Sequence, residues 1–551
     1  MLKENFIAFI EKSIVSNWKI DALADYKGGS FTYEEVAIQM VKLHIIFEKS
    51  GIKKGDKIAL IGKNSANWAI CFLAVISYGA IIVPILPDFT SEDVHNIINH
   101  SDAVMLFVGD HIVETIENKK IPEVKISIKV NDFTLLHSVD KPLAKDIFQN
   151  LENDFKVKFP DGLTPELFRL EHVPNQELAV ISYTSGTTGY SKGVMIPHNS
   201  LIANIRYAHE NMPLEPRDKI VSFLPLAHSY GCAFEFLFPF TLGCYITFLG
   251  KTPTPQIILQ AFKEIRPRLI LSVPLVIEKI YKKQILPLIS KPLMKVLLAT
   301  PGINLILHNK IKNKLTNVFG GNFREVVIGG AAFNKDAEIF FKKIKFPFSI
   351  GYGMTECGPL ISYASWEKAK LGAAGKIVNT MEVTIDSTDP LTQTGEILIR
   401  GENVMLGYYK NDKATREVLD SEGWLHTGDL GHIDKENFIY INGRSKSMIL
   451  GSSGQNIYPE ELEAKINNMT FVQESVVIEE NRKLVALIYP DKELMEKQGV
   501  DDEKLIGILN DHKNHLNHIV PTFMKIAEFR IYPQEFEKTP KKSIRRFLYT
   551  K

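Results

Sequence analysis

Short apolar runs alternate with longer amphipathic segments over most of the chain. Mostly apolar runs at 58–61, 104–108 and 179–183 predict buried strands. Residues 255–265 repeat apolar positions three and four apart, which predicts a helix with one buried face. This alternation is typical of an α/β fold with doubly wound, mostly parallel sheets. Ligands of such folds gather in the loops beyond the carboxyl ends of the strands.

One uncharged segment has two interpretations. No charged residue lies between Lys63 and Asp88, and a stretch of this length can cross a bilayer. Gly79 and Pro84 interrupt it, however, and the residues between them are strand-like. The pattern therefore favours a buried helix over about 68–78, followed by a buried strand.

The pattern changes twice toward the C-terminus. From about 377 to 442, short strands with few helices predict a small β subdomain. Proline and acidic residues at 459–463 then fit a first helical turn. Strand and helix patterns follow, so about a hundred residues form a separate small α+β domain. The sequence thus predicts a large N-terminal domain over 1–444 and a small domain over 445–551.

Charge and cysteine content narrow the class of protein. The 551 residues include 65 Lys and Arg against 64 Asp and Glu, which gives no case for a nucleic-acid partner. An anionic ligand must therefore be held locally. Four cysteines form no CxxC pair, and residues 1–17 lack a signal-peptide core, so a cytoplasmic location fits best. Nothing in the sequence indicates an oligomeric state.

The stretch from 183 to 194 is the most informative of the chain. It holds five serine or threonine hydroxyls, three glycines and one lysine between two apolar runs. Glycine lets backbone N–H groups turn toward an anion, and the hydroxyls and the lysine add donors. The GxxxxGK[ST] spacing of a Walker A loop is absent. The pattern predicts a polyphosphate site; the alternative is a surface turn.

Three further sites contain nucleotide-compatible residue types. Residues 351–356 follow a strand pattern and bring an aromatic ring, a hydroxyl and a carboxylate together. Such groups can stack on a base, contact phosphate and hold Mg²⁺. Asp429, in the stretch 423–429, can accept hydrogen bonds from ribose hydroxyls, and 443–446 holds an arginine and a lysine at the domain boundary. Each site alone also fits an ordinary turn.

In this order, the four sites resemble the adenylate-forming superfamily, which includes acyl-CoA synthetases, luciferases and nonribosomal adenylation domains. The resemblance covers nearly the whole chain and implies ATP, Mg²⁺ and coenzyme A as ligands. It implies that the ATP phosphates are held by Thr184, Ser185, Gly186, Thr187, Thr188, Gly189 and Lys192. The other implied nucleotide and hinge residues are Gly330, Ala331, Tyr352, Gly353, Thr355, Asp429, Arg444 and Lys446. Glu356 would bind Mg²⁺, Lys446 would be the hinge of a mobile C-terminal lid, and Gly454 would lie on the loop lining the thiol tunnel.

The C-terminal signature departs from the family pattern. Anchored on Thr539 and Arg545, the usual catalytic lysine position holds Ser543, and Lys542 lies one residue earlier. We expect Lys542 to act from a flexible strand end; the alternative is that 541–546 is only a basic tail. Thr184, Lys192, His228 and Lys542 then form the expected catalytic set.

Residues 224–231 are similar to the acyl-pocket segment of the long-chain fatty acid branch. His228 would gate that pocket, or is a packed histidine at a helix start. Phe234, Phe236, Leu237, Phe238 and Phe240 would line the pocket, or belong to the core. Residues 282–314 mix aliphatic side chains with many lysines, as in a helix pair that rests on a membrane surface or in an ordinary amphipathic insertion.

The leading hypothesis is therefore a long-chain fatty acid–CoA ligase that forms an acyl-adenylate. A second hypothesis keeps adenylation but uses an aryl or other acid, or a carrier-protein thiol as acceptor. A third, motivated by Ser543, is a nucleotide- or acyl-binding protein that has lost catalysis.

Overall fold

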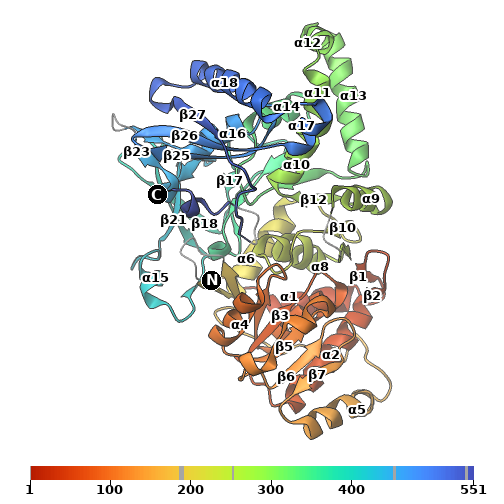
Figure 1. The fold of residues 1–551 in the computed structure, drawn as a ribbon. Helices are drawn as coiled ribbons and strands as arrows, with labels where there is room; N and C mark the ends of the chain where they lie inside the picture. The colour runs from red at the N-terminus through yellow and green to blue at the C-terminus, as the bar shows by residue number, and fades with distance from the viewer. Residues whose placement is uncertain are drawn as a thin grey trace.

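The computed structural model describes residues 2–184, 192–250, 254–391, 393–450, 455–539 and 544–550. A large α/β part occupies most of the chain, and a smaller α+β part formed by the C-terminal residues lies at one end of it (Figure 1). The predicted α/β class with mostly parallel sheets is confirmed.

The largest sheet has eight strands, in the order β20-β9-β8-β4-β3-β5-β6-β7. Its five central strands, from β8 to β6, are parallel, and β9, β20 and β7 run antiparallel to their neighbours. The strand bounds in this order are Gly407–Tyr408, Lys192–Pro197, Leu178–Thr184, Ile81–Ile85, Lys57–Ile61, Ala103–Val108, Ile126–Lys129 and Leu135–Ser138. The strands expected at 58–61, 104–108 and 179–183 are confirmed.

The uncharged segment forms the buried helix α3 (Ala66–Tyr78) and then β4 (Ile81–Ile85) in the centre of this sheet. Ser65 caps the helix by accepting a hydrogen bond from the Trp68 N–H, and Gly79 ends it with a φ of 83°. Nearly every side chain of α3 is buried because α2 (Tyr33–Lys49) covers it. Among the described residues, no helix is long and apolar enough to cross a membrane.

Two smaller sheets complete the α/β core. One has the order β10-β11-β1-β2, with bounds Lys219–Ser222, Tyr245–Phe248, Asp21–Asp25 and Ser30–Thr32. The other is all parallel and has the order β12-β13-β14, with bounds Leu269–Ser272, Glu325–Ile328 and Phe348–Ile350. Helix α9 (Pro255–Ile265) has the predicted bounds and buries Ile258, Ala261 and Phe262.

A four-stranded antiparallel sheet, β18-β19-β21-β22, follows (Met381–Asp386, Gly395–Gly401, Leu425–Ile433 and Ile439–Arg444). The sequence pattern assigned no strand to 425–433, because glycines and polar residues interrupt its alternation.

The remaining helices and strands of the large part lie between or beside these sheets in the chain. They are α1 (Phe6–Ser16), α4 (Ser91–His100), α5 (Lys141–Lys158), α6 (His198–Asn211), α7 (Ser229–Gly231), α8 (Phe238–Leu242), α10 (Pro274–Ile280), α14 (Lys335–Lys343), α15 (Asp412–Arg416), β15 (Tyr352–Gly353), β16 (Leu360–Tyr363) and β17 (Lys376–Ile377).

The C-terminal part has a hydrophobic core of its own. Strands β25 (Val472–Glu480), β26 (Lys483–Pro490) and β27 (Ile526–Ile531) form its sheet. Helices α16 (Pro459–Ile466), α17 (Lys492–Gln498) and α18 (Asp502–Ile519) accompany it, after a small hairpin of β23 (Ile449–Leu450) and β24 (Asn456–Ile457). Asn468 joins it to the large part through hydrogen bonds with Asn334 and Asp336.

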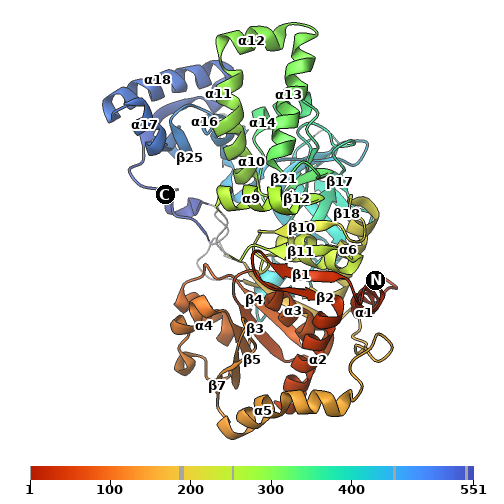
Figure 2. The same ribbon diagram turned by 90° about the vertical axis from the view of Figure 1, so that its right-hand side faces the viewer.

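Helices α11 (Leu286–Ile289), α12 (Pro292–Ala299) and α13 (Ile303–Val318) form a projection that we call the arm. Both ribbon views show it extending beyond the sheets, with α12 at its tip (Figures 1 and 2). Helices α11 and α12 have no buried residues, whereas α13 buries His308, Ile311 and Leu315 and contacts α9.

Candidate active site

The predicted phosphate loop connects the two antiparallel strands β8 and β9. Thr184 ends β8 and lies directly opposite Lys192, which begins β9. The intervening residues, among them Ser185, Gly186, Thr187, Thr188 and Gly189, lie outside the described residues. Because β8 is parallel to β4, the hairpin leaves the sheet at the carboxyl edge of the central strands, which is where ligands of α/β folds gather.

Tyr408 links Lys192 to Glu356. The Lys192 Nζ atom lies 4.6 Å from the centre of the Tyr408 ring, and the Tyr408 hydroxyl donates to Glu356 Oε1 at 2.9 Å. Burial, together with the neighbouring Glu356 carboxylate, raises the pKa of Tyr408, so the hydroxyl stays protonated and remains a donor. Tyr408 was not predicted from the sequence. The two adjacent tyrosines after Gly407 are the local feature that could have drawn attention to it.

A second cluster joins Tyr352, Asp429 and Arg444. The Tyr352 hydroxyl donates to Asp429 Oδ2 at 2.7 Å, and Arg444 Nε lies 3.0 Å from Asp429 Oδ1. Asp429 and Arg444 are partners in the β21–β22 register. Burial, and then the Asp429 carboxylate, raises the pKa of Tyr352. Three residues predicted from separate stretches thus meet, and a buried carboxylate beside an exposed guanidinium can bind hydroxyl groups.

Residues 352–356 connect the two clusters. A Cβ atom at Gly353 would lie 2.2 Å from the Pro359 carbonyl oxygen, so only glycine fits between Tyr352 and the turn that carries Thr355 and Glu356. The Met405 N–H donates to the Glu356 carbonyl oxygen at 2.8 Å, which fixes the backbone there. A short, closely packed segment therefore joins the two clusters.

Glu356 is a suitable ligand for Mg²⁺ held jointly with a polyphosphate. The described residues contain no group of three or more His, Cys, Asp or Glu side chains that could hold a metal ion. Mg²⁺ commonly takes one or two carboxylates and completes its shell with phosphate oxygens and water. A single, half-buried carboxylate beside Lys192 and Tyr408 fits that kind of shared site.

The implied nucleotide residues Gly330 and Ala331 are neighbours of the predicted acyl-pocket segment. Gly330 and Ala331 follow β13 and are exposed, and Gly330 has a φ of 89°. The Tyr230 hydroxyl donates to the Val327 carbonyl oxygen at 3.1 Å, which places residues 224–231 against β13. His228 is half-exposed just before α7. A carboxylate bound near His228 would therefore lie close to a nucleotide bound near Gly330.

The phenylalanines that follow this segment lie mainly in the core. Phe236 packs against Phe72 with ring centres 5.8 Å apart, and Phe240 packs 4.9 Å from Tyr33. Phe238 and Leu237 are also fully buried. Phe234 is equally buried in the same core cluster, and its ring also contacts Tyr230 edge to face at 6.0 Å.

The C-terminal tail meets the edge of the large sheet from which the phosphate hairpin leaves. Thr539 and Arg545 line a cavity of about 360 Å³ together with Asp88, Thr90 and Asp93. Asp88 lies three residues after the end of β4, and β4 is the parallel neighbour of β8. Lys542 and Ser543 lie outside the described residues, as does Gly454; Lys446 is exposed in the turn Ser445–Ser447 after β22.

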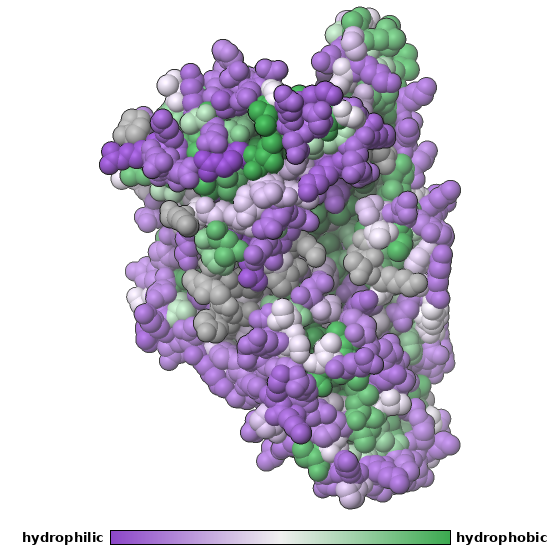
Figure 3. All heavy atoms as spheres, in the orientation of Figure 1, coloured by the Kyte–Doolittle hydropathy of each residue, from purple (hydrophilic) through white to green (hydrophobic). Residues whose placement is uncertain are grey.

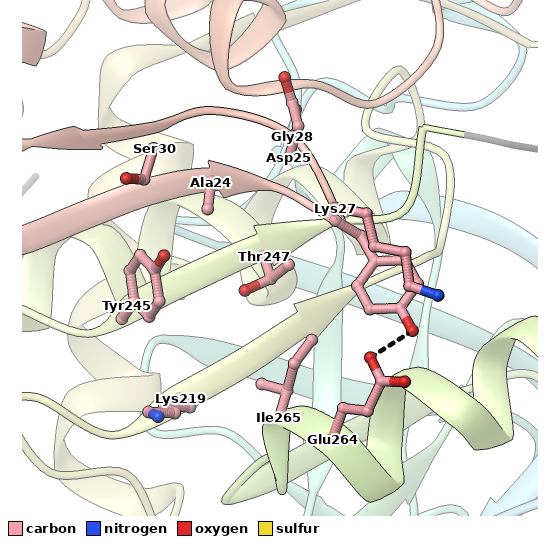
Figure 4. A pocket seen from close by; sticks show the side chains of 11 residues that line it. Ala24, Asp25, Lys27, Gly28, Ser30, Lys219, Tyr245, Thr247, Glu264 and Ile265 are labelled. Atoms are coloured by element: carbon pink, nitrogen blue, oxygen red, sulfur yellow. Dashed lines mark hydrogen bonds between the residues drawn. The ribbon is translucent and has the colours of Figure 1, made fainter.

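A second cavity lies away from these residues. Figure 4 shows it beside β1, β11 and α9. Tyr26, which also lines it, donates to Glu264 Oε2 at 2.6 Å. It has a volume of about 310 Å³ and contains none of the predicted site residues. This second cavity is therefore not part of the candidate active site, which is defined by the side chains described above.

Comparison with known proteins identifies the family. Residues 12–409 match the model of the AMP-binding enzyme family. The chain belongs to this family. The predicted membership of the adenylate-forming superfamily is thereby confirmed, and enzymes of this family use ATP, Mg²⁺ and coenzyme A.

The relatives of this AMP-binding enzyme differ in substrate. The long-chain-fatty-acid–CoA ligase FadD15 of Mycobacterium bovis is 28% identical over 540 residues, covering 90% of this chain and 86% of that protein. The chloroplastic long-chain-fatty-acid–[acyl-carrier-protein] ligase AEE15 of Arabidopsis thaliana is 28% identical, covering 86% and 74%. The anthranilate CoA ligase AuaEII, solved with anthranoyl-AMP, superposes with a TM-score of 0.78 at 19% identity, covering 100% and 97%, and shows the shared fold.

Proposed function

We propose that this AMP-binding enzyme is a long-chain fatty acid–CoA ligase. It would join a fatty acid to ATP as an acyl-adenylate, release pyrophosphate, and transfer the acyl group to coenzyme A with release of AMP. The observation that supports this best is the position of Tyr408, which brings Lys192 and Glu356 together at the base of the phosphate hairpin. The similarity to FadD15 and the segment 224–231 support the long-chain substrate class.

Charge repulsion is the main obstacle to the first step. A fatty carboxylate oxygen must attack the α-phosphorus of ATP while the bond to pyrophosphate breaks, and both partners are anionic. Two unit charges about 4 Å apart repel by about 4 kcal/mol at an effective dielectric constant near 20. In this proposal Lys192 and Lys542 offset that repulsion, and Thr184 positions the phosphates at the start of the loop. Mg²⁺, when bound at Glu356, would supply further positive charge to the phosphate oxygens.

The second cluster would position the nucleoside. Asp429 accepts hydrogen bonds from ribose hydroxyls, and Arg444 lies beside the same sugar. Tyr352, held by its hydrogen bond to Asp429, contacts the adenine that Gly330 and Ala331 flank, and Thr355 contacts phosphate. The Asp429 carboxylate is buried and already paired, so it binds ribose without first having to be ordered.

The second step would use the small C-terminal domain. We propose its boundary at residues 444–445 and Lys446 as the hinge about which it turns, bringing the loop with Gly454 to the thiol. The hydrogen bonds of Asn468 with Asn334 and Asp336 join the two parts in the present arrangement and must break during that rotation.

Release of AMP in a coupled assay with purified protein tests this function. Octanoate, palmitate, oleate and benzoate are compared, each with and without coenzyme A. We expect rapid release only with the long-chain acids and coenzyme A together. Strong ATP–pyrophosphate exchange with benzoate and none with palmitate would contradict the substrate class.

Two alternatives have distinct signatures in the same assay. A carrier-protein thiol as acceptor, as the similarity to AEE15 suggests, would give AMP release with acyl carrier protein in place of coenzyme A. A protein that has lost catalysis would bind ATP but exchange no pyrophosphate with any acid.

We also propose a cytoplasmic location with peripheral membrane contact through about 282–314. All four cysteines are free and buried, which suits a reducing compartment.

A further inference from the structure

The tip of the arm exposes large apolar side chains. Leu293 and Val296 on α12 are 71% and 64% exposed, and Leu305 and Ile306 at the start of α13 are 65% and 69% exposed. No side chain of α12 is buried. Hydrophobic residues gather over this end of the molecule in Figure 3. A cluster of this kind is typical of an interaction surface, because soluble proteins rarely expose several large aliphatic residues side by side.

The arm is held at its base and not at its tip. His308, Ile311 and Leu315 are the buried residues of α13, and they anchor it on the body, where α13 contacts α9. Helix α12 contacts only its two neighbours in the arm closely, α11 and α13. The exposed apolar side chains therefore contribute little to the fold of the body, and their burial requires another molecule.

The charge of the arm indicates which kind of molecule covers its tip. The run from Lys279 to Arg324 contains nine lysines and arginines and no aspartate or glutamate. The whole chain is balanced, with 65 basic and 64 acidic residues, so a run of this length would hold about five acidic residues at the average frequency. Lys291, which directly precedes α12, and Lys295 on α12 are both exposed. An apolar tip that also carries exposed lysines is complementary to an apolar layer with an anionic surface.

We infer that the tip of the arm docks on an anionic lipid bilayer. Leu293, Val296, Leu305 and Ile306 enter the boundary between headgroups and acyl chains, while Lys291 and Lys295 contact anionic headgroups. A second copy of this chain fits the surface less well, because two acid-free basic arms would repel each other. The inference deepens the proposed function, since a bilayer is where long-chain acids are concentrated.

Vesicle co-sedimentation of the full-length protein tests this docking. Vesicles of phosphatidylcholine alone are compared with vesicles of phosphatidylcholine and phosphatidylglycerol. We expect binding to the mixed vesicles to be about tenfold tighter or more, and to weaken as salt is raised. The assay contains no ATP, fatty acid or coenzyme A, so its failure is distinguishable from a failure of the ligase assay.

Two double variants and a matched control separate docking from general adhesion. We expect Leu305→Ser with Ile306→Ser, and Lys291→Glu with Lys295→Glu, each to weaken binding about tenfold. The control, Leu143→Ser with Val157→Ser, removes exposed aliphatic residues from α5, which lies at the opposite end of the molecule (Figure 1) and contains acidic residues. The control should bind as the wild type does. Thermal melting checks that all variants are folded.

Three results would overturn the inference. The first is that the wild type does not bind the mixed vesicles. The second is that both arm variants bind these vesicles as tightly as the wild type does. The third is a wild-type dimer in analytical ultracentrifugation that becomes a monomer on Leu305→Ser with Ile306→Ser, because the surface would then be an interface between copies of this chain.

Discussion

The hydroxyl of Tyr408 donates a hydrogen bond to Glu356 Oε1 at 2.9 Å, across 52 residues of sequence. The contact depends on the sheet, because β20 pairs with β9 and so brings Tyr408 beside Lys192. One buried ring thus sets the position of the cation and of the carboxylate that the proposed chemistry needs.

Tyr408→Phe should weaken the use of Mg²⁺. The ring beside Lys192 remains, but the charged Glu356 carboxylate no longer accepts a hydrogen bond from the hydroxyl. A hydrogen bond to a charged group is worth about 1.5–3 kcal/mol. We expect the Mg²⁺ concentration for half-maximal AMP release to rise about tenfold. Tyr409→Phe is the matched control, since the Tyr409 hydroxyl pairs with Asp102 instead, at 2.7 Å. An unchanged Mg²⁺ titration would show that Glu356 does not hold the metal.

Asp429→Asn should reduce the affinity for ATP. The substitution keeps the shape but removes the charge that pairs with Arg444, and it replaces one acceptor of the proposed ribose contacts. We expect the dissociation constant for ATP, measured calorimetrically without an acid substrate, to rise about tenfold or more. Asp434→Asn, whose carboxylate pairs with Lys370 near the surface, is the control and should leave that constant unchanged. Equal affinities for wild type and Asp429→Asn would place the ribose elsewhere.

Lys542→Ala should abolish most adenylation. If Lys542 replaces the usual lysine, its loss removes a positive charge from the transition state, and ATP–pyrophosphate exchange should fall about a hundredfold. Ser543→Ala and Lys541→Ala should both retain exchange near the wild-type rate. Should Lys542→Ala exchange pyrophosphate normally, the basic tail has no catalytic role.

Glu325 should make stability depend on pH. This buried carboxyl accepts hydrogen bonds from the Tyr363 hydroxyl and the Trp366 N–H, and burial raises its pKa to about 7. In the unfolded chain it titrates near its ordinary value, so between about pH 4.5 and 7 the folded state binds more protons. Stability contributed by protonated Glu325 is therefore present at low pH and is lost as pH rises through 7.

Glu325→Gln removes this titration while keeping an oxygen acceptor. Relative to the variant, the wild type should lose up to about 3 kcal/mol between pH 4.5 and pH 8, measured as the difference in unfolding midpoints. Glu382→Gln, at an exposed pair with Arg400, should follow the wild type at every pH. Parallel pH profiles of wild type and Glu325→Gln would contradict the assignment.

Much of the fold followed from local patterns. The helix over 255–265 agrees with the structure because its apolar residues recur three and four positions apart. The strand over 104–108 agrees because a short uninterrupted apolar run is typical of a strand buried on both faces. Strand β21 was missed because Gly428 and Gly431 interrupt its alternation. Its partner strands β19 and β22 determine its conformation, and a local pattern contains no information about them.

The chain alone determined its family, its α/β alternation and the residue types that surround a polyphosphate, since these depend on neighbours a few positions apart. Only the tertiary structure decided that Tyr408 joins Lys192 to Glu356, that Phe236 and Phe240 belong to the core, and that the tip of the arm is uncovered. These relationships depend on the order of strands in the sheets and on which faces meet. In the folded protein, packing brings together segments about two hundred residues apart. The periodicity of one segment contains no information about such contacts.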